Sequence, residues 1–303
     1  MRRIGTDIAP RLDWRGAVAA LEAGHRLPRA EIGDLFLGPP EATSLTRAAR
    51  IEGLGVGVKS VTVHPGNPSR GLPSVQGAML VFDPDDGRPT ALIDSALVTA
   101  FKTAADSVLG ARLLARADPE TLLIVGAGTV AASLTRAYPA NFPSLRRILV
   151  WARRPSQAQQ FSAEHGRDLP VEAVMDLADA AKDADIISTA TMAAAPVLSG
   201  EMVPDGAHVD LIGAFRKDMR EADDALMKRG AIYVDSKATT IDHIGELTIP
   251  LSEGTIARDD ILGDLYDLVA DRPDRADGAV TVFKNGGGAH LDLMIADWIV
   301  QHA

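Results

Sequence analysis

Apolar and polar positions change their spacing near residue 117, and this change divides the chain into two parts. In the first part, two segments have apolar residues at helical spacing and two alternate apolar with polar residues. These segments are 13–24, 95–116, 54–63 and the hairpin 78–94. Asp13 is a suitable N-cap for the first helix, and Gly24 is expected to end it. The pattern predicts a mixed α+β domain over residues 1–116.

The second part alternates short apolar runs with helical stretches. The apolar runs predicted to be strands are 121–126, 147–152, 185–190, 207–212 and 231–235. Repeated β-α units imply a parallel sheet with helices on both of its faces. We therefore predict a Rossmann-type, doubly wound α/β domain over 117–285. Residues 286–303 contain a glycine turn and then helical spacing, so they are predicted to form a helix that completes the first domain.

The first strand of the second domain runs into the turn Gly-x-Gly-x-x-Ala, which opens a helix. Small residues also occur at ordinary strand-to-helix turns, but this strand and helix supply the context of a dinucleotide site. Gly126 makes the tight turn, Gly128 lets the backbone approach a pyrophosphate, and Ala131 lets the helix pack closely on the strand. The phosphates then lie at the helix N-terminus. The predicted cofactor contacts in the turn are Gly126, Ala127, Gly128, Thr129 and Val130.

The end of the second strand distinguishes between the two nicotinamide cofactors. NAD-specific folds place a carboxylate there to bind the ribose hydroxyls, whereas this strand ends in Ala152, Arg153 and Arg154. Guanidinium groups suit the 2′-phosphate of NADPH, so NADPH is the predicted cofactor and NADH the alternative. The other interpretation of the arginine pair is a solvated basic turn. Turns at the same edge of the sheet are predicted to supply the remaining cofactor contacts: Thr189, Ala190, Thr191, Gly213 and Lys284.

Composition limits the remaining function classes. The net charge of −10 argues against a nucleic-acid or anionic-membrane surface, which needs clustered Lys and Arg. The chain has no cysteine, which excludes disulfides and thiolate catalysis, and its histidines lack metal-ligand spacing, so we assign no metal. No apolar run is long enough to span a bilayer, and residues 1–14 do not resemble a signal peptide. These features predict a cytoplasmic protein with a small-molecule substrate.

Five further blocks follow one another between about residue 50 and the C-terminus: VKSVTVHPGNPSRGLPSVQG, KTAADSVLGARLLAR, LIVGAGTVA, HVDLIGAFRKDMREADDAL and TVFKNGGGAHLDLM. In this order they resemble the ornithine cyclodeaminase/μ-crystallin family. Within the family they are most similar to Δ1-pyrroline-2-carboxylate reductases, which are ketimine reductases that make proline from a cyclic imino acid. The resemblance implies a homodimer that uses NAD(P)H. It also implies that the second domain binds the cofactor, whereas the first pairs the subunits and holds the substrate.

The resemblance further implies the substrate-binding residues. Lys59 matches the lysine that contacts the substrate, and Lys102 stands where the family usually has an arginine that binds the substrate carboxylate. A lysine keeps the charge but loses the bidentate fork. The family's upstream arginine has two candidates, Arg47 and Arg50, because the segment before Lys59 is short and lacks the usual Met-Pro block. Lys59 and Lys102 are the predicted catalytic residues, and Lys59 is expected to keep the imine protonated.

One departure separates the reactions of the family. Cyclodeaminases carry an aspartate after the Ile-Gly-Ala turn, where this chain has Phe215. Without that carboxylate, ornithine lacks a partner for its second ammonium, whereas Phe215 suits the apolar flank of a ring. We therefore predict NAD(P)H-dependent reduction of Δ1-pyrroline-2-carboxylate to L-proline, or of the six-membered Δ1-piperideine-2-carboxylate. The alternatives are an ornithine cyclodeaminase, an amino-acid dehydrogenase, and a non-catalytic NADPH-binding protein of the μ-crystallin type.

Overall fold

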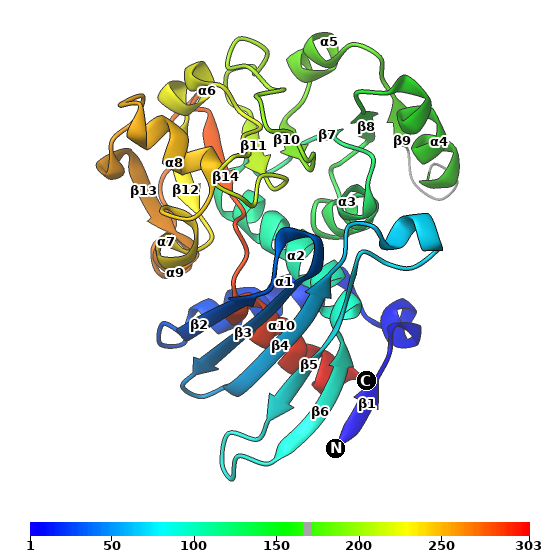
Figure 1. Ribbon diagram of the computed structural model, residues 1–303. Coiled ribbons are helices and arrows are strands. Elements are labelled where there is room, and N and C mark those ends of the chain that lie inside the picture. The colour runs from blue at the N-terminus through cyan, green and yellow to red at the C-terminus, as the bar shows by residue number, and fades with distance from the viewer. Residues whose placement is uncertain (166–170) are drawn as a thin grey trace. The chain divides into compact units, whose positions relative to one another are not determined.

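The computed structural model describes residues 1–165 and 171–303, and the chain forms two compact units. Unit 1 consists of residues 1–105 and 288–303, and unit 2 consists of residues 106–287. Each unit contains one β-sheet (Figure 1). Unit 1 is therefore discontinuous in the sequence.

Unit 1 is built on a six-stranded mixed sheet with the order β1-β6-β5-β4-β3-β2, in which β1 and β6 are parallel and the other neighbours antiparallel. The strands are β1 (Arg2–Ile4), β2 (Glu31–Leu37), β3 (Thr43–Ile51), β4 (Gly55–Val63), β5 (Val75–Phe82) and β6 (Pro89–Asp94). β4 confirms the predicted strand, and β5 and β6 confirm the hairpin. β2 and β3 lie in a segment for which the sequence pattern predicted no strand.

Helix α10 (Ala289–His302) packs against β2, β3, β4 and β5, and α1 (Trp14–His25) packs against α10 (Figure 1). The side chain of Asp13 accepts a hydrogen bond from the Gly16 N–H at 2.8 Å, which confirms the predicted N-cap. The prediction that Gly24 ends α1 is wrong. A Cβ at residue 24 would lie 2.5 Å from the Met294 side chain, so this glycine allows close packing of α1 on α10.

Unit 2 is built on an eight-stranded sheet with the order β13-β12-β14-β11-β10-β7-β8-β9, and every pair of neighbours is parallel. The strands are β7 (Thr121–Val125), β8 (Arg147–Trp151), β9 (Val171–Ala173), β10 (Ile186–Thr189), β11 (His208–Leu211), β12 (Ala231–Val234), β13 (Ile261–Asp264) and β14 (Thr281–Lys284). The five strands predicted from the β-α alternation are confirmed. β9 and β13 were not predicted, because their sequences, Val-Glu-Ala and Ile-Leu-Gly-Asp, are not continuous apolar runs.

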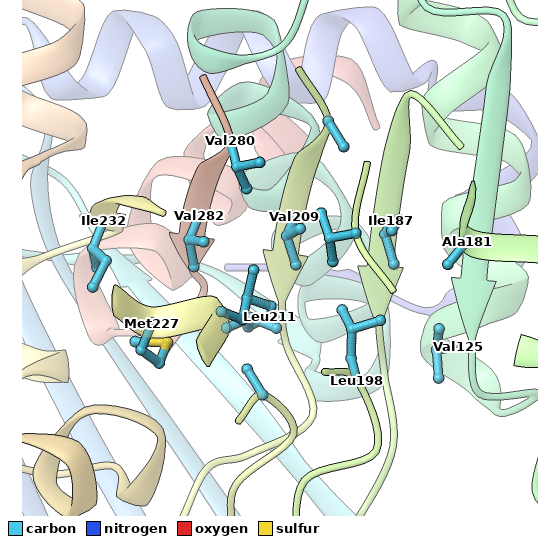
Figure 2. Packing of buried hydrophobic residues seen from close by; sticks show 14 of the residues in the cluster. Val125, Ala181, Ile187, Leu198, Val209, Leu211, Met227, Ile232, Val280 and Val282 are labelled. Carbon is cyan, nitrogen blue, oxygen red and sulfur yellow. The ribbon is translucent and has the colours of Figure 1, made fainter. Parts of the chain in front are cut away.

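Helices cover both faces of this parallel sheet. On one face, strand residues such as Val125, Ile187 and Val209 form a buried apolar cluster with Ala181 and Met227 (Figure 2). The helices that lie wholly within the described part of this unit are α3 (Thr129–Asn141), α4 (Pro155–His165), α5 (Leu177–Lys182), α6 (Asp224–Arg229), α7 (Lys237–Thr240), α8 (Gly245–Ser252) and α9 (Leu265–Ala270). Short 3₁₀ helices are η1 (Thr6–Arg11), η2 (Pro40–Ala42), η3 (Asn67–Arg70) and η4 (Arg258–Asp260).

The opposite face of the sheet contacts α3 and the second half of α2 (Ser95–Leu114). A Cβ at Gly110 of α2 would lie 2.7 Å from the fully buried Phe283 ring of β14, so helix and strand approach closely. Helices on both faces of a parallel sheet confirm the doubly wound α/β prediction. Within the described part of the chain, no helix combines the length and the apolar composition that crossing a bilayer requires.

The face that contacts α3 contains a fully buried carboxylate, Asp210 of β11. The Ser188 hydroxyl donates to Asp210 Oδ2 at 2.6 Å, and the Tyr138 hydroxyl of α3 lies 3.3 Å from the same atom. Burial raises the pKa of Asp210 from 3.8 to about 7, although these hydroxyls and the charge of Lys284 oppose the shift. The folded protein therefore holds a proton on Asp210 in a pH range where the unfolded chain has lost it.

This difference makes the stability contribution of Asp210 fall as the pH rises from about 4 to about 7. A shift of about three pKa units corresponds to about 4 kcal/mol. We expect Asp210→Asn to be close to wild type in stability near pH 4 and increasingly more stable than wild type up to about pH 7, above which the difference levels off. Urea unfolding at several pH values measures this difference, with the exposed Asp118→Asn as the control. A stability difference independent of pH would contradict the assignment.

Candidate active site

The strand order of unit 2 reverses between β7 and β10. The chain moves outward from β7 to β8 and β9, then returns to β10 on the other side of β7. In doubly wound sheets, ligands bind at such a reversal, outside the carboxyl ends of the strands. The Gly126–Val130 turn follows β7, and Thr189–Thr191 lies at the end of β10, so both predicted contact segments lie at this position.

Gly126 and Gly128 serve different physical purposes in the turn. Gly126 has φ +124, and a Cβ there would lie 2.6 Å from the Ala190 carbonyl oxygen, so only glycine fits. Gly128 has an ordinary φ of −107, and a Cβ there would meet no heavy atom within 4 Å. Side chains therefore leave the space beside the Gly128 backbone open. Ala131 is fully buried, as close packing of α3 on β7 requires.

The N-terminus of α3 suits the phosphates of a dinucleotide. Its N-cap residue is Gly128, which offers no side chain to the N–H groups of the first turn. A helix N-terminus of this kind attracts anions through those N–H groups and through the helix dipole. Arg153 and Arg154 follow β8, the strand beside β7, and both are exposed. Neither arginine forms an ion pair with another residue of 1–165 or 171–303.

The segments after β10 and β11 are held together by the fully buried carboxylate of Glu221. Its Oε1 accepts hydrogen bonds from the Thr191 N–H at 2.8 Å and the Thr191 hydroxyl at 2.6 Å. Its Oε2 accepts from the Thr189 hydroxyl at 2.8 Å and the Gly213 N–H at 2.6 Å. Glu221 thus fixes three of the predicted contact residues at the carboxyl edge of the sheet.

A second layer of buried charge supports Glu221. The Glu246 carboxylate accepts hydrogen bonds at 2.9 Å from the N–H groups of Glu221 and Ala222, and burial raises its pKa to about 7. Lys284, predicted to contact the cofactor, is fully buried, and its ammonium donates to the Leu211 carbonyl at 2.8 Å. Burial lowers the pKa of Lys284, opposed first by the charge of Glu246. The Lys284 ammonium therefore supports the end of β11 from inside unit 2.

Unit 1 contains the predicted substrate-binding lysines. β3 and β4 place Arg47 directly opposite Lys59, on the face of the sheet that α10 covers. The Lys59 ammonium donates to Asp292 Oδ1 of α10 at 2.5 Å and lies 3.5 Å from the Thr99 hydroxyl. Lys102 of α2 is also buried.

The charges around Lys59 favour an anionic ligand. Burial lowers the pKa of Lys59, the charges of Lys102 and Arg47 lower it further, and Asp292 opposes the change. Arg47 itself forms an ion pair with Asp34, with 2.5 Å between Nη2 and Oδ2. The three cations Lys59, Lys102 and Arg47 therefore outnumber the two carboxylates that pair with them, Asp292 and Asp34. This excess of positive charge suits a substrate that carries a carboxylate.

Arg50 and Phe215 are the other two predicted substrate-binding residues. Arg50 is three positions from Arg47 on β3, so its side chain points to the opposite face of the sheet, where it pairs with Glu31 at 2.8 Å and is largely exposed. Phe215 follows β11 in unit 2 and is 55% exposed. Its ring centroid lies 5.6 Å from the Arg216 guanidinium carbon. Of the two candidate arginines, Arg47 is the one on the Lys59 face.

An open parallel sheet with an uncapped helix N-terminus at its strand reversal is the architecture of dinucleotide-dependent enzymes. Residues 47–303 match the ornithine cyclodeaminase/mu-crystallin family, and the chain belongs to this family. It is 60% identical over 298 residues to the Δ1-pyrroline-2-carboxylate reductase of Paracoccus denitrificans, with 97% of this chain and 94% of the relative covered.

Solved structures agree with this assignment. The structure of Thermococcus litoralis Δ1-pyrroline-2-carboxylate reductase in complex with NADH and L-proline is 26% identical, with a TM-score of 0.93 over 100% of this chain and 97% of the other. An archaeal alanine dehydrogenase dimer with bound NAD is also 26% identical, with a TM-score of 0.91 over 100% of this chain and 96% of the other.

Three buried acidic residues of these clusters were missed by sequence reasoning: Glu221, Glu246 and Asp292. Glu221 stands in the block DMREADDAL, and Asp292 is a carboxylate inside the apolar stretch AHLDLMIADWIV. A charge inside an apolar helical run is the available signal, because charged residues are seldom buried without a partner. The sequence does not identify that partner.

The role of Glu221 can be tested by Glu221→Gln. A glutamine keeps one acceptor oxygen and replaces the other by an NH₂ group. The threonine hydroxyl beside the NH₂ group can rotate and accept from it, but the backbone N–H on that side, of Thr191 or of Gly213, loses its acceptor. We expect the free energy of unfolding to fall by about 1–3 kcal/mol, since one buried donor remains unsatisfied. Urea unfolding measures the change. The exposed Glu201→Gln is the matched control, and equal stability of the two variants would refute the role.

Proposed function

We propose that this protein reduces Δ1-pyrroline-2-carboxylate to L-proline with a reduced nicotinamide dinucleotide, which makes it an oxidoreductase that acts on a C=N bond. The observation that carries the proposal is the 60% identity over nearly the whole chain to a reductase of that name. The fold of a reductase in complex with NADH and L-proline supports it further. The buried cations of unit 1 and the glycine turn of unit 2 supply the two kinds of binding group that the reaction needs.

Unit 2 is the proposed nucleotide-binding domain, and unit 1 the proposed substrate-binding and dimerisation domain. A relative that is described as a dimer supports a homodimer. The cofactor supplies a hydride when it is bound. We assign the phosphates to the Gly126–Val130 turn and the remaining contacts to Thr189–Thr191 and Gly213. The Lys284 ammonium supports the end of β11 through its hydrogen bond to the Leu211 carbonyl.

NADPH is the proposed preferred cofactor, although relatives of this chain bind NADH and NAD. The argument is the pair Arg153 and Arg154 at the end of β8, where NAD-specific folds have a carboxylate. Two exposed guanidinium groups without an ion-pair partner in the described residues can bind a 2′-phosphate.

In unit 1, Lys59, Lys102 and Arg47 are proposed to hold the substrate carboxylate. Lys59 is also proposed to donate a proton to the ring nitrogen, because a protonated imine accepts a hydride more readily at carbon. One proton on nitrogen and one hydride on carbon convert the imino acid to the amino acid. A lysine at position 102 attracts the carboxylate as a point charge and does not fix its plane as an arginine would.

Phe215 argues against ornithine cyclisation. An exposed phenylalanine at this position offers neither a partner for the second ammonium of ornithine nor a base to deprotonate it. An apolar ring can instead contact the CH₂ groups of a cyclic imino acid.

The substrate assignment is tested with purified protein and a panel of substrates. We expect NADPH consumption with Δ1-pyrroline-2-carboxylate, slower consumption with NADH, and little ammonia release from ornithine. Δ1-Piperideine-2-carboxylate tests ring size, and alanine with the oxidised cofactor tests the dehydrogenase alternative. Cofactor binding without turnover of any substrate would favour a non-catalytic binding protein and overturn the proposal.

The nucleotide site is tested by Gly128→Ala. The residue has an ordinary φ and open space around its Cβ, so the variant should fold, with a change in unfolding free energy of at most about 1 kcal/mol. The added methyl group occupies the space assigned to the pyrophosphate, so the dissociation constant of the dinucleotide should rise by about tenfold or more. Fluorescence titration measures it. Gly33→Ala, which also meets no atom within 4 Å, is the control, and unchanged affinity in Gly128→Ala would contradict the assignment.

A further inference from the structure

The contact between Lys59 and Asp292 joins two distant parts of the chain within unit 1. Lys59 lies on β4, Asp292 lies on α10, and 2.5 Å separates Lys59 Nζ from Asp292 Oδ1. The two side chains are 8% and 1% exposed. Asp292 Oδ2 has no hydrogen-bond partner among the described residues, so the carboxylate acts on Lys59 through one oxygen.

The surroundings of Lys59 make this contact important for its charge. A buried ammonium loses its hydration, and the cations Arg47 on β3 and Lys102 on α2 repel it further. Among the described groups that act on Lys59, Asp292 is the carboxylate that opposes these effects. Asp34 on β2 pairs with Arg47 and lies outside this contact.

Two histidines also lie near this cluster. His290 precedes Asp292 on α10, and its ring centroid lies 5.7 Å from that of His25 on α1. Burial lowers the pKa of His290 well below its usual value, and the charges of His25, Lys102 and Arg47 lower it further. His290 is therefore neutral at neutral pH and does not replace Asp292 as a counter-charge.

We propose that Asp292 is a positioning residue for the reduction: it holds the Lys59 ammonium in one place and in the charged form from which it donates a proton to the substrate nitrogen. This inference rests on the proposed function. In the step, one N–H bond of Lys59 breaks as a new N–H bond forms with the lone pair of the ring nitrogen. Lys59 then regains a proton from solvent. Asp292 does not touch the substrate, and its effect passes through Lys59.

The test is the pH dependence of kcat and kcat/KM for Δ1-pyrroline-2-carboxylate in Asp292→Asn, from about pH 6 to about pH 10. Asparagine keeps the shape and an acceptor oxygen but removes the charge, so Lys59 should lose its proton at a lower pH. The alkaline limb of the kcat profile should move down by about one pH unit, and kcat near pH 7 should fall about 10- to 100-fold. The dissociation constant of the dinucleotide should stay unchanged.

Asp297→Asn is the matched control, because Asp297 lies on the same helix and bonds Gln301 rather than Lys59. It should retain the wild-type profile. Asp292→Glu is the second variant and keeps the charge on a longer side chain. It should keep the alkaline limb of wild type and lose kcat, because the ammonium is displaced. In a Lys59→Gln background, Asp292→Asn should have no further effect on kcat.

Several outcomes would overturn the inference while leaving the proposed function intact. One is an active Asp292→Asn variant whose alkaline limb coincides with that of wild type. Another is a shifted limb in Asp292→Glu, and a third is an additive loss of kcat in the double variant. If wild type itself does not reduce the imino acid, the proposed function fails, and the inference fails with it.

Discussion

A carboxylate buried away from water is stable only where donors or a cation replace its hydration, and both units are organised around such a group. In unit 2, Glu221 accepts four hydrogen bonds and links the segments that follow β10 and β11. In unit 1, Asp292 accepts from the Lys59 ammonium and links α10 to β4. Apart from the Gly213 contact, these hydrogen bonds join residues 30 or more positions apart in the sequence, so they depend on the folded unit.

Local patterns in the sequence were sufficient to predict most of the secondary structure of unit 2. The β-α alternation predicted its central strands, and the glycine pattern predicted the strand-to-helix turn that lies at the strand reversal, because both depend on neighbouring residues. β3 was missed, since its apolar and polar residues do not alternate regularly and most of its side chains are only partly buried. Glu221 and Asp292 could not be paired with their partners, because such pairing depends on the three-dimensional fold rather than on spacing along the chain.

Members of this family share a fold but differ in the substrates that they are described as using. Relatives with the same fold are described as a reductase of a cyclic imino acid and as an alanine dehydrogenase. The shared sheet can therefore explain how these relatives bind a nucleotide, but not which substrate each of them uses. We propose that the substrate preference depends on a few positions. These are the cations near Lys59, where Lys102 stands in place of the family's usual arginine, and Phe215, where cyclodeaminases have an aspartate.

The discontinuity of unit 1 has a consequence for the order of folding during synthesis. Residues 106–287 form a compact unit, and they leave the ribosome before residues 288–303. β4 is made early, but the helix that covers its inner face is made only after the whole of unit 2. Until then the Lys59 ammonium lacks its Asp292 partner. The pair that we connect with proton transfer is consequently one of the latest contacts a newly made chain can form.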